Sequence, residues 1–552
     1  MTKRPRLHWW ISLALLVLGG AVSLAFLGFK QALPVVGREP AARNVLRVVY
    51  AQRLLPDPLV RTFPLSTYNL FIQSLWETLV ECDPLTGQPQ PAAAASWAWS
   101  ADYRILSLQL RPDARWSNGD RVVAADFVRG WLRLLRSRID LAYTLFPIKN
   151  AEAYHRGARD RPEAVGIRAV DELTLQIELD QPRTTFVAEL ADPLLAPIHA
   201  SMTAADASGK PDRGPTGWVT NGPFHLTAEN DDGYRMEASA FYHGHGKVRL
   251  AGVQFTRVNS PSIGALLVAA GAADLVPSYA VMPDFRWPTQ RPVAVESELA
   301  LAVVASYFNV TRGPLRDLRV RQALALALNR EDLINESDRS RLVPAWSWVP
   351  DMPGRRGLSL FQEDPAAARR LLAEAGYPGG KDFPILRLSL PRELEGDPYP
   401  TACSEKWFKE LGIRVYVSYE DAMSRRQRLT AGDYDIIYGM LVATVADPAD
   451  LLNVFTMPVE YSETRWRDEE TIRLLMTANH KVGSERLGLV DQVERRAMAS
   501  AAAVPLMFVR RQALRSAEVR GWYADPLARQ ATKRLWLDVP GDAPASHEAA
   551  GQ

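Results

Sequence analysis

Residues 91–135 read PAAAASWAWSADYRILSLQLRPDARWSNGDRVVAADFVRGWLRLL, and this stretch contains two kinds of hydrophobic pattern. Residues 106–110 (LSLQL) alternate apolar and polar side chains, a period of two that predicts a half-buried β-strand. Residues 124–135 (AADFVRGWLRLL) place Phe127 and Trp131 on one side of a helical repeat. The stretch therefore predicts a strand followed by an amphipathic helix.

The same alternation recurs on both sides of this stretch. Residues 44–51 (NVLRVVYA) and 173–179 (LTLQIEL) are further strand candidates. In the second half, residues 385–390 (ILRLSL) and 413–419 (IRVYVSY) also alternate, and a helical segment near residues 401–411 separates them. A strand, a helix and a second strand in this order form a β-α-β unit, which implies a parallel sheet with a right-handed crossover. The chain is thus predicted to be of the α/β class.

Residues with strong positional preferences mark the helix ends of the second half. Asp317 is a candidate N-cap for a helix with Val320 on its apolar face. Asp364 and Pro365 have the residue types of an N-cap and a first helical position, and Gly376 stops that helix. We therefore expect two helices between the strands of this region.

Residues 434–442 (YDIIYGMLV) form a mostly apolar run after a helical segment near residues 422–431. Such a run is suited to a buried parallel strand. Residues 376–381 (GYPGGK) look superficially like a phosphate loop, but Asp382 stands where a serine or threonine is needed. They are better explained as a helix stop and a turn.

Size and composition limit the class of protein. The chain has 552 residues, and because single hydrophobic cores stop growing at ~250–300 residues, two or three domains are expected. The 65 basic residues nearly balance the 63 acidic ones, so no long-range field gathers nucleic acid. Cys82 and Cys403 are the two cysteines and form no CxxC motif. A disulfide between them is left open, and two buried thiols are the favoured interpretation.

The N-terminus carries an export signal. Lys3, Arg4 and Arg6 precede an uncharged, mostly apolar stretch at residues 9–29, an arrangement that sends the following chain across a membrane. The stretch is long for a signal peptide and just long enough to span a bilayer, which needs ~20 residues. A small-residue cleavage site could end at Ala25. Both a cleaved signal and a permanent anchor are compatible with the sequence, and either predicts a periplasmic chain from about residue 44 onward.

The sequence carries no recognisable motif of catalysis or metal binding. Neither GxSxG nor HExxH occurs. His243 and His245 have no neighbouring carboxylate or cysteine in the sequence, so a surface turn is favoured over a metal site. Asp231 and Asp232 precede Gly233 and predict a solvated turn. We therefore predict a binding protein with no catalytic residues, no metal and no cofactor, rather than an enzyme.

Several motifs occur in the order found in one known family. Residues 113–119 (DARWSNG) and 125–128 (ADFV) of the opening stretch match that family's DAKWSDG and TAxDFV patterns in order and spacing. Further matches are Ser96-Trp97, Leu110-Arg111, Asn221-Gly222-Pro223-Phe224, Phe308-Asn309, Arg319-Val320-Arg321-Gln322-Ala323-Leu324, Ala375-Gly376-Tyr377-Pro378, Glu410-Leu411-Gly412-Ile413, Val504-Pro505-Leu506 and Gly521. From residue 44 to residue 536 the chain resembles the peptide and nickel family of extracellular solute-binding proteins, typified by oligopeptide-binding proteins.

The resemblance implies an α/β fold of the periplasmic binding protein type, with two lobes, a hinge, mixed sheets and three subdomains. A ligand that touches both lobes only when they are closed favours closure. The expected N-terminal divisions are a signal peptide or membrane anchor (1–30) and a linker (31–43). Lobe I is expected at residues 44–79 and 218–300 with an extra subdomain at 80–217, and lobe II at residues 301–515. The chain is then expected to return to lobe I at residues 516–541, with a strand near residues 522–537, and to end in a disordered tail (542–552).

The resemblance also implies a ligand site. The family pattern FDxxxxGWxADYxxP aligns with residues 434–448, and its second aspartate pairs with the ligand's α-amino group. Thr444 stands at that position and Leu441 at the position of the tryptophan. Asp447 is either a substitute anchor or, as favoured, a turn aspartate before Pro448. Because a threonine cannot neutralise an ammonium, blocked peptides, sugar-like solutes and amine-free ligands become more plausible than free-amine peptides. Further ligand-binding candidates at matching positions are Tyr438, Pro64, Leu65, Ser66, Met507 and Phe508.

The leading hypothesis is an extracytoplasmic binding component of an ABC importer. It would bind a peptide or peptide-like solute between its lobes as a monomer and deliver it to permease subunits in the inner membrane. The alternative is a membrane-anchored ligand sensor or scaffold on the same fold with no role in transport.

Overall fold

The computed structural model describes residues 44–538, except 62–64, 85, 138–139, 203–216, 279–292, 353, 458, 460–461 and 524. The predicted signal or anchor, the linker, Pro64 and the tail lie outside the described residues. Within the described part of the chain, no helix has the length and apolar character that a membrane span requires.

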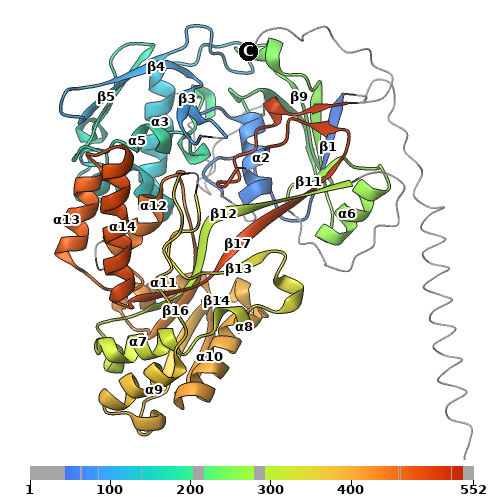
Figure 1. Ribbon diagram of the computed structural model, residues 1–552. Coiled ribbons are helices and arrows are strands. Elements are labelled where there is room, and N and C mark those ends of the chain that lie inside the picture. The colour runs from blue at the N-terminus through green and yellow to red at the C-terminus, as the bar shows by residue number, and fades with distance from the viewer. Residues whose placement is uncertain are drawn as a thin grey trace, which may run out of the picture.

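An 11-stranded mixed sheet extends through both lobes (Figure 1). Its centre is an antiparallel pair of long strands, β12 (Val293–Phe308) and β17 (Ala503–Ser516). On one side of this pair lie β16 (Ile436–Val442), β14 (Leu386–Pro391) and β15 (Val415–Glu420). On the other side lie β11 (Leu275–Val276), β1 (Val45–Tyr50), β10 (Gly252–Arg257), β9 (Gly233–Ala238) and β8 (Phe224–Asn230), while β13 (Leu342–Pro344) also pairs with β17.

Two separate hydrophobic cores flank the central strands. The core of lobe I draws its side chains from residues 46–275, with Val519 and Leu535 from near the C-terminus. The core of lobe II draws its side chains from residues 301–508, with Leu527. Because β12 and β17 extend through both halves of the sheet, they are the covalent and hydrogen-bonded connection between the lobes (Figure 1).

A second sheet in lobe I contains strands from residues 91–135. Its order is β4 (Ala94–Trp99), β5 (Ile105–Leu110), β7 (Thr174–Glu178) and β6 (Ile167–Ala169), and α3 (Ala124–Arg136) covers it. The predicted strands and the predicted helix are confirmed. Asp126 accepts hydrogen bonds from the Trp116 indole nitrogen and the Val123 amide, both at 3.0 Å, and thereby fixes the start of α3. Other elements of lobe I are α2 (Leu65–Leu75), β2 (Val80–Cys82), β3 (Pro89–Pro91), α4 (Ala151–His155), α5 (Phe186–Glu189) and α6 (Pro261–Ala269).

Lobe II contains the predicted β-α-β unit. Strands β14 and β15 pair in parallel, and α10 (Pro398–Leu411) connects them. Asp317 caps α7 (Leu318–Leu326), and Asp364 caps α9 (Pro365–Glu374), as predicted. The remaining helices are α8 (Arg330–Leu333), α11 (Ala422–Ala431), α12 (Pro448–Leu452), α13 (Glu469–Ala478) and α14 (Gly483–Ala499).

The prediction of a buried parallel strand at residues 434–442 is only partly right. Strand β16 is parallel to β14 but antiparallel to β12. Ile436 and Ile437 are buried, whereas Met440 is 48% exposed. The reason is that the second half of β16 leaves the core of lobe II and approaches lobe I, a change of surroundings that hydrophobicity alone does not show.

The C-terminal return is also less regular than predicted. Within the described part of residues 522–537, the only strand is β19 (Trp536–Leu537), which pairs with β18 (Val519–Arg520). Both cysteines are free thiols: Cys403 is buried, as favoured, and Cys82 is half-buried.

The surface turn expected at His243 is a buried contact instead. The Nε2 atom of His243 lies 2.7 Å from Glu77 Oε2, and the two side chains are 14% and 6% exposed. The Tyr242 hydroxyl and the Lys533 ammonium contact the other oxygen of Glu77. His245 lies 2.9 Å from the Ser239 carbonyl oxygen. The carboxylate beside His243 was missed because 166 positions separate the two residues.

Candidate functional site

The loop that follows β16 lies where the two lobes meet. Residues 443–447 lead from β16 into α12, and Asp447 is the N-cap of that helix, accepting a 2.8 Å hydrogen bond from the Ala449 amide. Arg486 of α14 approaches the Asp447 carboxylate at 3.0 and 3.1 Å. Asp447 therefore has the position of a turn aspartate before Pro448, and its charge is neutralised within lobe II.

Thr444 is hydrogen-bonded to a carboxylate six residues further along the chain. Its amide and its hydroxyl donate to Asp450 Oδ2 at 2.5 and 3.0 Å, and the Val445 amide donates to the same oxygen at 3.2 Å. Asn453 Nδ2 lies 3.4 Å from Oδ1. All of these donors are neutral, and among the residues that the structure describes Asp450 has no ion-pair partner. The direct contacts of the carboxylate are thus all with uncharged groups, and the nearby Arg183 acts on it without forming an ion pair.

The electrostatic surroundings of Asp450 follow from that arrangement. Burial raises the pKa of the Asp450 carboxyl, and the nearby Glu189 raises it further. The hydrogen bonds from Thr444 and the positive charge of Arg183 lower the pKa and offset only part of this rise. A cation placed beside Asp450 would reverse this balance, because an opposite charge within ~4–6 Å favours the ionised carboxylate. The site is therefore suited to receive a positively charged group.

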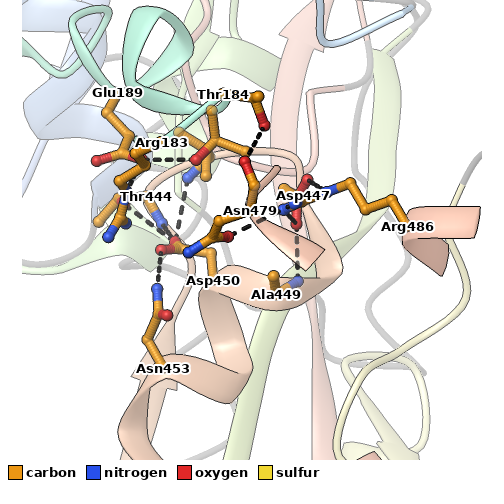
Figure 2. A network of polar contacts seen from close by, with 12 residues as sticks. Arg183, Thr184, Glu189, Thr444, Asp447, Ala449, Asp450, Asn453, Asn479 and Arg486 are labelled. Atoms are coloured by element: carbon orange, nitrogen blue, oxygen red, sulfur yellow. Dashed lines mark hydrogen bonds and ion pairs between the residues drawn. The ribbon is translucent and has the colours of Figure 1, made fainter. Parts of the chain in front are cut away.

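Lobe I presents its own polar residues to this loop (Figure 2). Arg183 Nε lies 2.6 Å from Glu189 Oε1, and the Thr185 hydroxyl donates to the same oxygen at 2.9 Å. The Thr184 hydroxyl and amide donate to the carbonyl oxygen of Asn479 at 3.0 and 3.3 Å, so this hydrogen bond joins lobe I to the end of α13 in lobe II. The two lobes are in direct contact here.

A groove lies beside this contact and is shared by both lobes. Its volume is about 320 Å³, at the lower end of the size range of ligand pockets. The lobe I wall is formed by Phe146, Pro147, Asp180, Gln181, Pro182 and Arg183, and the lobe II wall by Asn453, Thr456, Ile472, Leu475, Met476 and Asn479. Because its walls combine apolar and polar side chains, it can hold a small amphiphilic ligand. A larger pocket of about 640 Å³ lies within lobe I near Tyr50 and the β8–β9 turn, away from the interlobe contact.

The structure brings together only some of the ligand-binding residues predicted from the sequence. Thr444 and Asp447 are in the interlobe loop, and Leu441 is half-buried at the end of β16. Three other candidates, Tyr438, Met507 and Phe508, are buried in the core of lobe II, where the Tyr438 hydroxyl donates to Asp397 at 3.2 Å. Leu65 and Ser66 are the first residues of α2, and Pro64 is outside the described residues. Ser66 lines a small cavity beside Glu298 and Arg511, near the central strands.

Sequence reasoning missed the residues that complete this network. Asp450, Arg183 and Glu189 come from segments that show no motif, and Arg183 lies more than 250 positions from Asp450. The one local signal is the spacing Asp447-Pro448-Ala449-Asp450, since an acidic residue in the first turn of a helix is a site of backbone hydrogen bonding.

Comparison with known proteins gives consistent results. A sequence model of the bacterial extracellular solute-binding proteins, family 5 (middle), matches residues 88–462. The dipeptide-binding protein DppE of Bacillus subtilis (strain 168) is 25% identical over 456 residues, covering 80% of this chain and 82% of that protein. The periplasmic oligopeptide-binding protein OppA of Escherichia coli (strain K12) is 25% identical over 483 residues, covering 84% of this chain and 87% of that protein.

The fold is also found among solved structures. The Escherichia coli murein tripeptide-binding protein MppA superposes with a TM-score of 0.72 at 24% identity, over 89% of this chain and 98% of that one. The likeness extends over both lobes and confirms the two-lobed α/β fold expected from the sequence.

Proposed function

The chain belongs to the bacterial extracellular solute-binding proteins of family 5, and from that premise we propose that it is the extracytoplasmic binding component of an ABC importer. It binds peptides or peptide-like small solutes between its lobes and delivers them to a permease. The observation that carries this proposal is the family match over residues 88–462, together with a ligand-sized groove where the lobes meet.

The ligand class is supported by the relatives. Proteins that bind dipeptides and oligopeptides are similar to this chain over four-fifths of its length or more. Peptides offer an ammonium, a carboxylate and amide groups, and the interlobe network presents polar partners for each of these. Its charged members are Arg183, Glu189, Asp447, Asp450 and Arg486, of which Asp450 forms no ion pair within the described part of the chain. A ligand that contacts both lobes stabilises their closed arrangement by its differential affinity for that state.

Asp450, and not Thr444, supplies the negative charge that neutralises a ligand ammonium. A threonine hydroxyl cannot neutralise an ammonium, but here it donates to Asp450 and holds that carboxylate in place. A buried charge without a partner is costly, and a ligand ammonium beside Asp450 would remove that cost. Free-amine peptides are therefore compatible with this site despite the substitution, and Asp450 is the residue that selects them.

Transport places further requirements on the chain. The protein works outside the cytoplasm, after export through its N-terminal segment as a free or anchored periplasmic protein. It acts as a monomer, because one chain supplies both lobes, and the permease distinguishes its open and closed forms. Its role is binding and release, with no chemical change to the ligand.

Native mass spectrometry of the full chain recovered from its own periplasm tests the proposal directly. We expect adducts whose masses form a series of short peptides, with fragmentation showing free amino termini. A single non-peptide adduct would keep the fold and overturn the peptide assignment. A ligand-free protein whose melting temperature does not respond to a peptide library would instead favour an anchored sensor or scaffold.

A further inference from the structure

Residues 525–531, here called the strap, cross the junction of the two lobes beside the central strands. The ladder between β12 and β17 is irregular at this junction, since Leu299 pairs with Arg510 but the next pair is Val303 with Phe508. In this gap the strap supplies the missing partner, because the Leu301 amide donates to the Pro526 carbonyl oxygen at 3.0 Å. A backbone segment from near the C-terminus thus completes the hydrogen bonding of the connection between the lobes.

Side chains on the central strands hold the strap from one side. The Asp525 amide donates to Glu298 Oε2 of β12 at 2.6 Å, and the guanidinium of Arg511 on β17 donates to the Asp525 carbonyl oxygen. Glu298 and Arg511 also form an ion pair at 3.4 Å, with both side chains about 15% exposed. The strap is therefore bound to both crossing strands.

The strap is attached to each lobe by a separate contact. Asn69 of α2 in lobe I donates to the Ala528 carbonyl oxygen at 3.0 Å, while the side chain of Leu527 packs in the core of lobe II. Ala528 is fully buried and has a φ of 59°, a left-handed conformation that a residue with a Cβ adopts only when its surroundings impose it. The strap is thus held in a strained shape by contacts to both lobes.

Arg529 extends from the strap to the loop that carries Thr444. One guanidinium nitrogen donates to the Thr444 carbonyl oxygen, and the other lies 3.5 Å from the sulfur of Cys82 in lobe I. The Arg529 amide is bonded to Asp525 Oδ2 at 2.9 Å, which fixes the base of the side chain. The guanidinium therefore joins β2 of lobe I to the loop of lobe II at the edge of the interlobe network.

We infer that the strap is a closure latch and that Arg529 is a positioning residue that acts on the Thr444 loop. The hydrogen bond to Thr444 forms only when the loop of lobe II lies against β2, so opening of the lobes breaks it. Such a charge-assisted hydrogen bond stabilises the closed arrangement before any ligand is present. Its loss is expected to lower the ratio of closed to open molecules about ten-fold.

The latch is distinct from ligand recognition. Arg529 donates to a backbone carbonyl oxygen, whereas Asp450 offers the carboxylate that faces a ligand cation. Removing Arg529 should weaken the binding of every ligand by the same factor. The ratio of affinities for a free-amine peptide and its N-acetylated form should stay unchanged, because that ratio reports on Asp450. The inference of a latch goes beyond the proposed transport function and does not require it.

Small-angle X-ray scattering of the ligand-free full chain, combined with peptide binding by calorimetry, tests the latch. The variants are Arg529→Ala, Arg529→Lys, which keeps the charge with a single donor group, and Arg495→Ala, an exposed arginine of α14, as control. We expect Arg529→Ala to enlarge the radius of gyration or to weaken affinity about ten-fold with the free-amine to acetylated ratio unchanged. Arg529→Lys should recover part of the effect, and Arg495→Ala should behave as the parent chain.

Three results would overturn the latch. One is an Arg529→Ala protein that scatters and binds as the parent does. Another is a changed affinity ratio, which would assign Arg529 to amine recognition. If Arg529→Ala does not fold, Asn69→Ala releases the strap from lobe I and should produce the same expansion, so unchanged scattering of that variant is the third. A protein that binds no peptide at all would defeat the proposed function, while the scattering of the ligand-free variants would still decide on the latch.

Discussion

Glu77 in lobe I and Asp450 at the edge of lobe II are both carboxylates withdrawn from solvent, yet their surroundings shift their pKa values in opposite directions. Burial alone would raise the pKa of Glu77, but Lys533, His243 and Tyr242 together lower it. Burial also raises the pKa of Asp450, and there the neutral donors of its own loop and the nearby Arg183, which is not in contact with it, do not overcome that rise. The difference lies in whether a cation of the same chain is in contact with the carboxylate.

The comparison separates structural from functional use of a buried charge. Glu77 joins three distant segments of lobe I, because Tyr242, His243 and Lys533 all contact it. Its network is complete without a ligand. Asp450 lies where the lobes meet and has only neutral partners among the described residues. A carboxylate at an interlobe surface that contacts no cation of its own chain is available to a ligand.

The largest expected effect is on the stability of lobe I, when the contacts of Glu77 with Lys533, His243 and Tyr242 are broken. Glu77→Gln leaves the Lys533 ammonium with Glu81 as its remaining carboxylate at 2.8 Å, so we expect lobe I to lose about 3 kcal/mol of stability, the lower end for a broken buried pair. Because the folded-state pKa of Glu77 is lowered, this stabilisation is present above its unfolded pKa and is lost as the pH falls through the folded value. Urea unfolding at pH 7 measures the loss, and Glu77→Gln with Lys533→Met should recover part of it. An unchanged midpoint would contradict the assignment.

A second test concerns Glu298 beside the strap, where burial raises the pKa to about 7 despite the ion pair with Arg511. A carboxyl with a raised folded-state pKa stabilises the fold fully below its unfolded pKa, and this stabilisation is lost as the pH rises through about 7. Compared with Glu298→Gln, the parent chain should therefore lose about 2 kcal/mol between pH 5 and pH 8. Chemical unfolding at both pH values measures this. Glu296→Gln on the same strand is the control, and parallel pH profiles of parent and Glu298→Gln would refute the prediction.

The variant Asp450→Asn tests whether the carboxylate of the interlobe loop recognises a ligand ammonium. At neutral pH this variant should be at least as stable as the parent, because it removes a charge whose pKa is raised. Affinity for a free-amine peptide should fall about 10- to 100-fold, while affinity for the N-acetylated peptide stays the same. Calorimetry with both peptides gives the two values. Asp447→Asn is the matched control, since Arg486 already neutralises Asp447. Equal losses for both peptides would show that Asp450 has no part in amine recognition.

The smallest effect is expected at Thr444. Thr444→Val removes the 3.0 Å hydrogen bond to Asp450 but leaves the two amide donors in place. We expect a loss of about 1 kcal/mol in affinity for the free-amine peptide, a factor of about five. Thr430→Val removes a hydroxyl bond to the Arg426 carbonyl oxygen on an exposed helix and serves as control. If both variants bind as the parent does, Asp450 is positioned by the backbone alone.

Local rules predicted much of the fold. Alternation identified β5, β7, β14 and β15, and the aspartates before α7 and α9 were correctly identified as N-caps. These signals are readable because strand period and helix capping depend on residues within a few positions of one another. Strand β16 was misjudged in its second half because its surroundings change from core to interlobe surface along seven residues.

The candidate site was less accessible to sequence reasoning. The loop was located through the family pattern, and the replacement at Thr444 was visible as a departure from it. The consequence of that replacement was not visible, because it depends on Asp450 folding back onto the loop. Likewise, the contact of His243 with Glu77 could not be predicted from the sequence around His243. The contact of the Thr444 loop with Arg529 could not be predicted either, because Arg529 lies 85 positions further along the chain.

The sequence by itself determined the α/β class, the order of the main strands and helices and the two-lobed family, since these follow from short-range periodicity and from ordered motifs. Only the tertiary structure decided which charges are neutralised. That outcome depends on contacts between residues as far as 39 and 456 positions apart and on the exclusion of water around them. Neither can be deduced from the charge of a side chain alone.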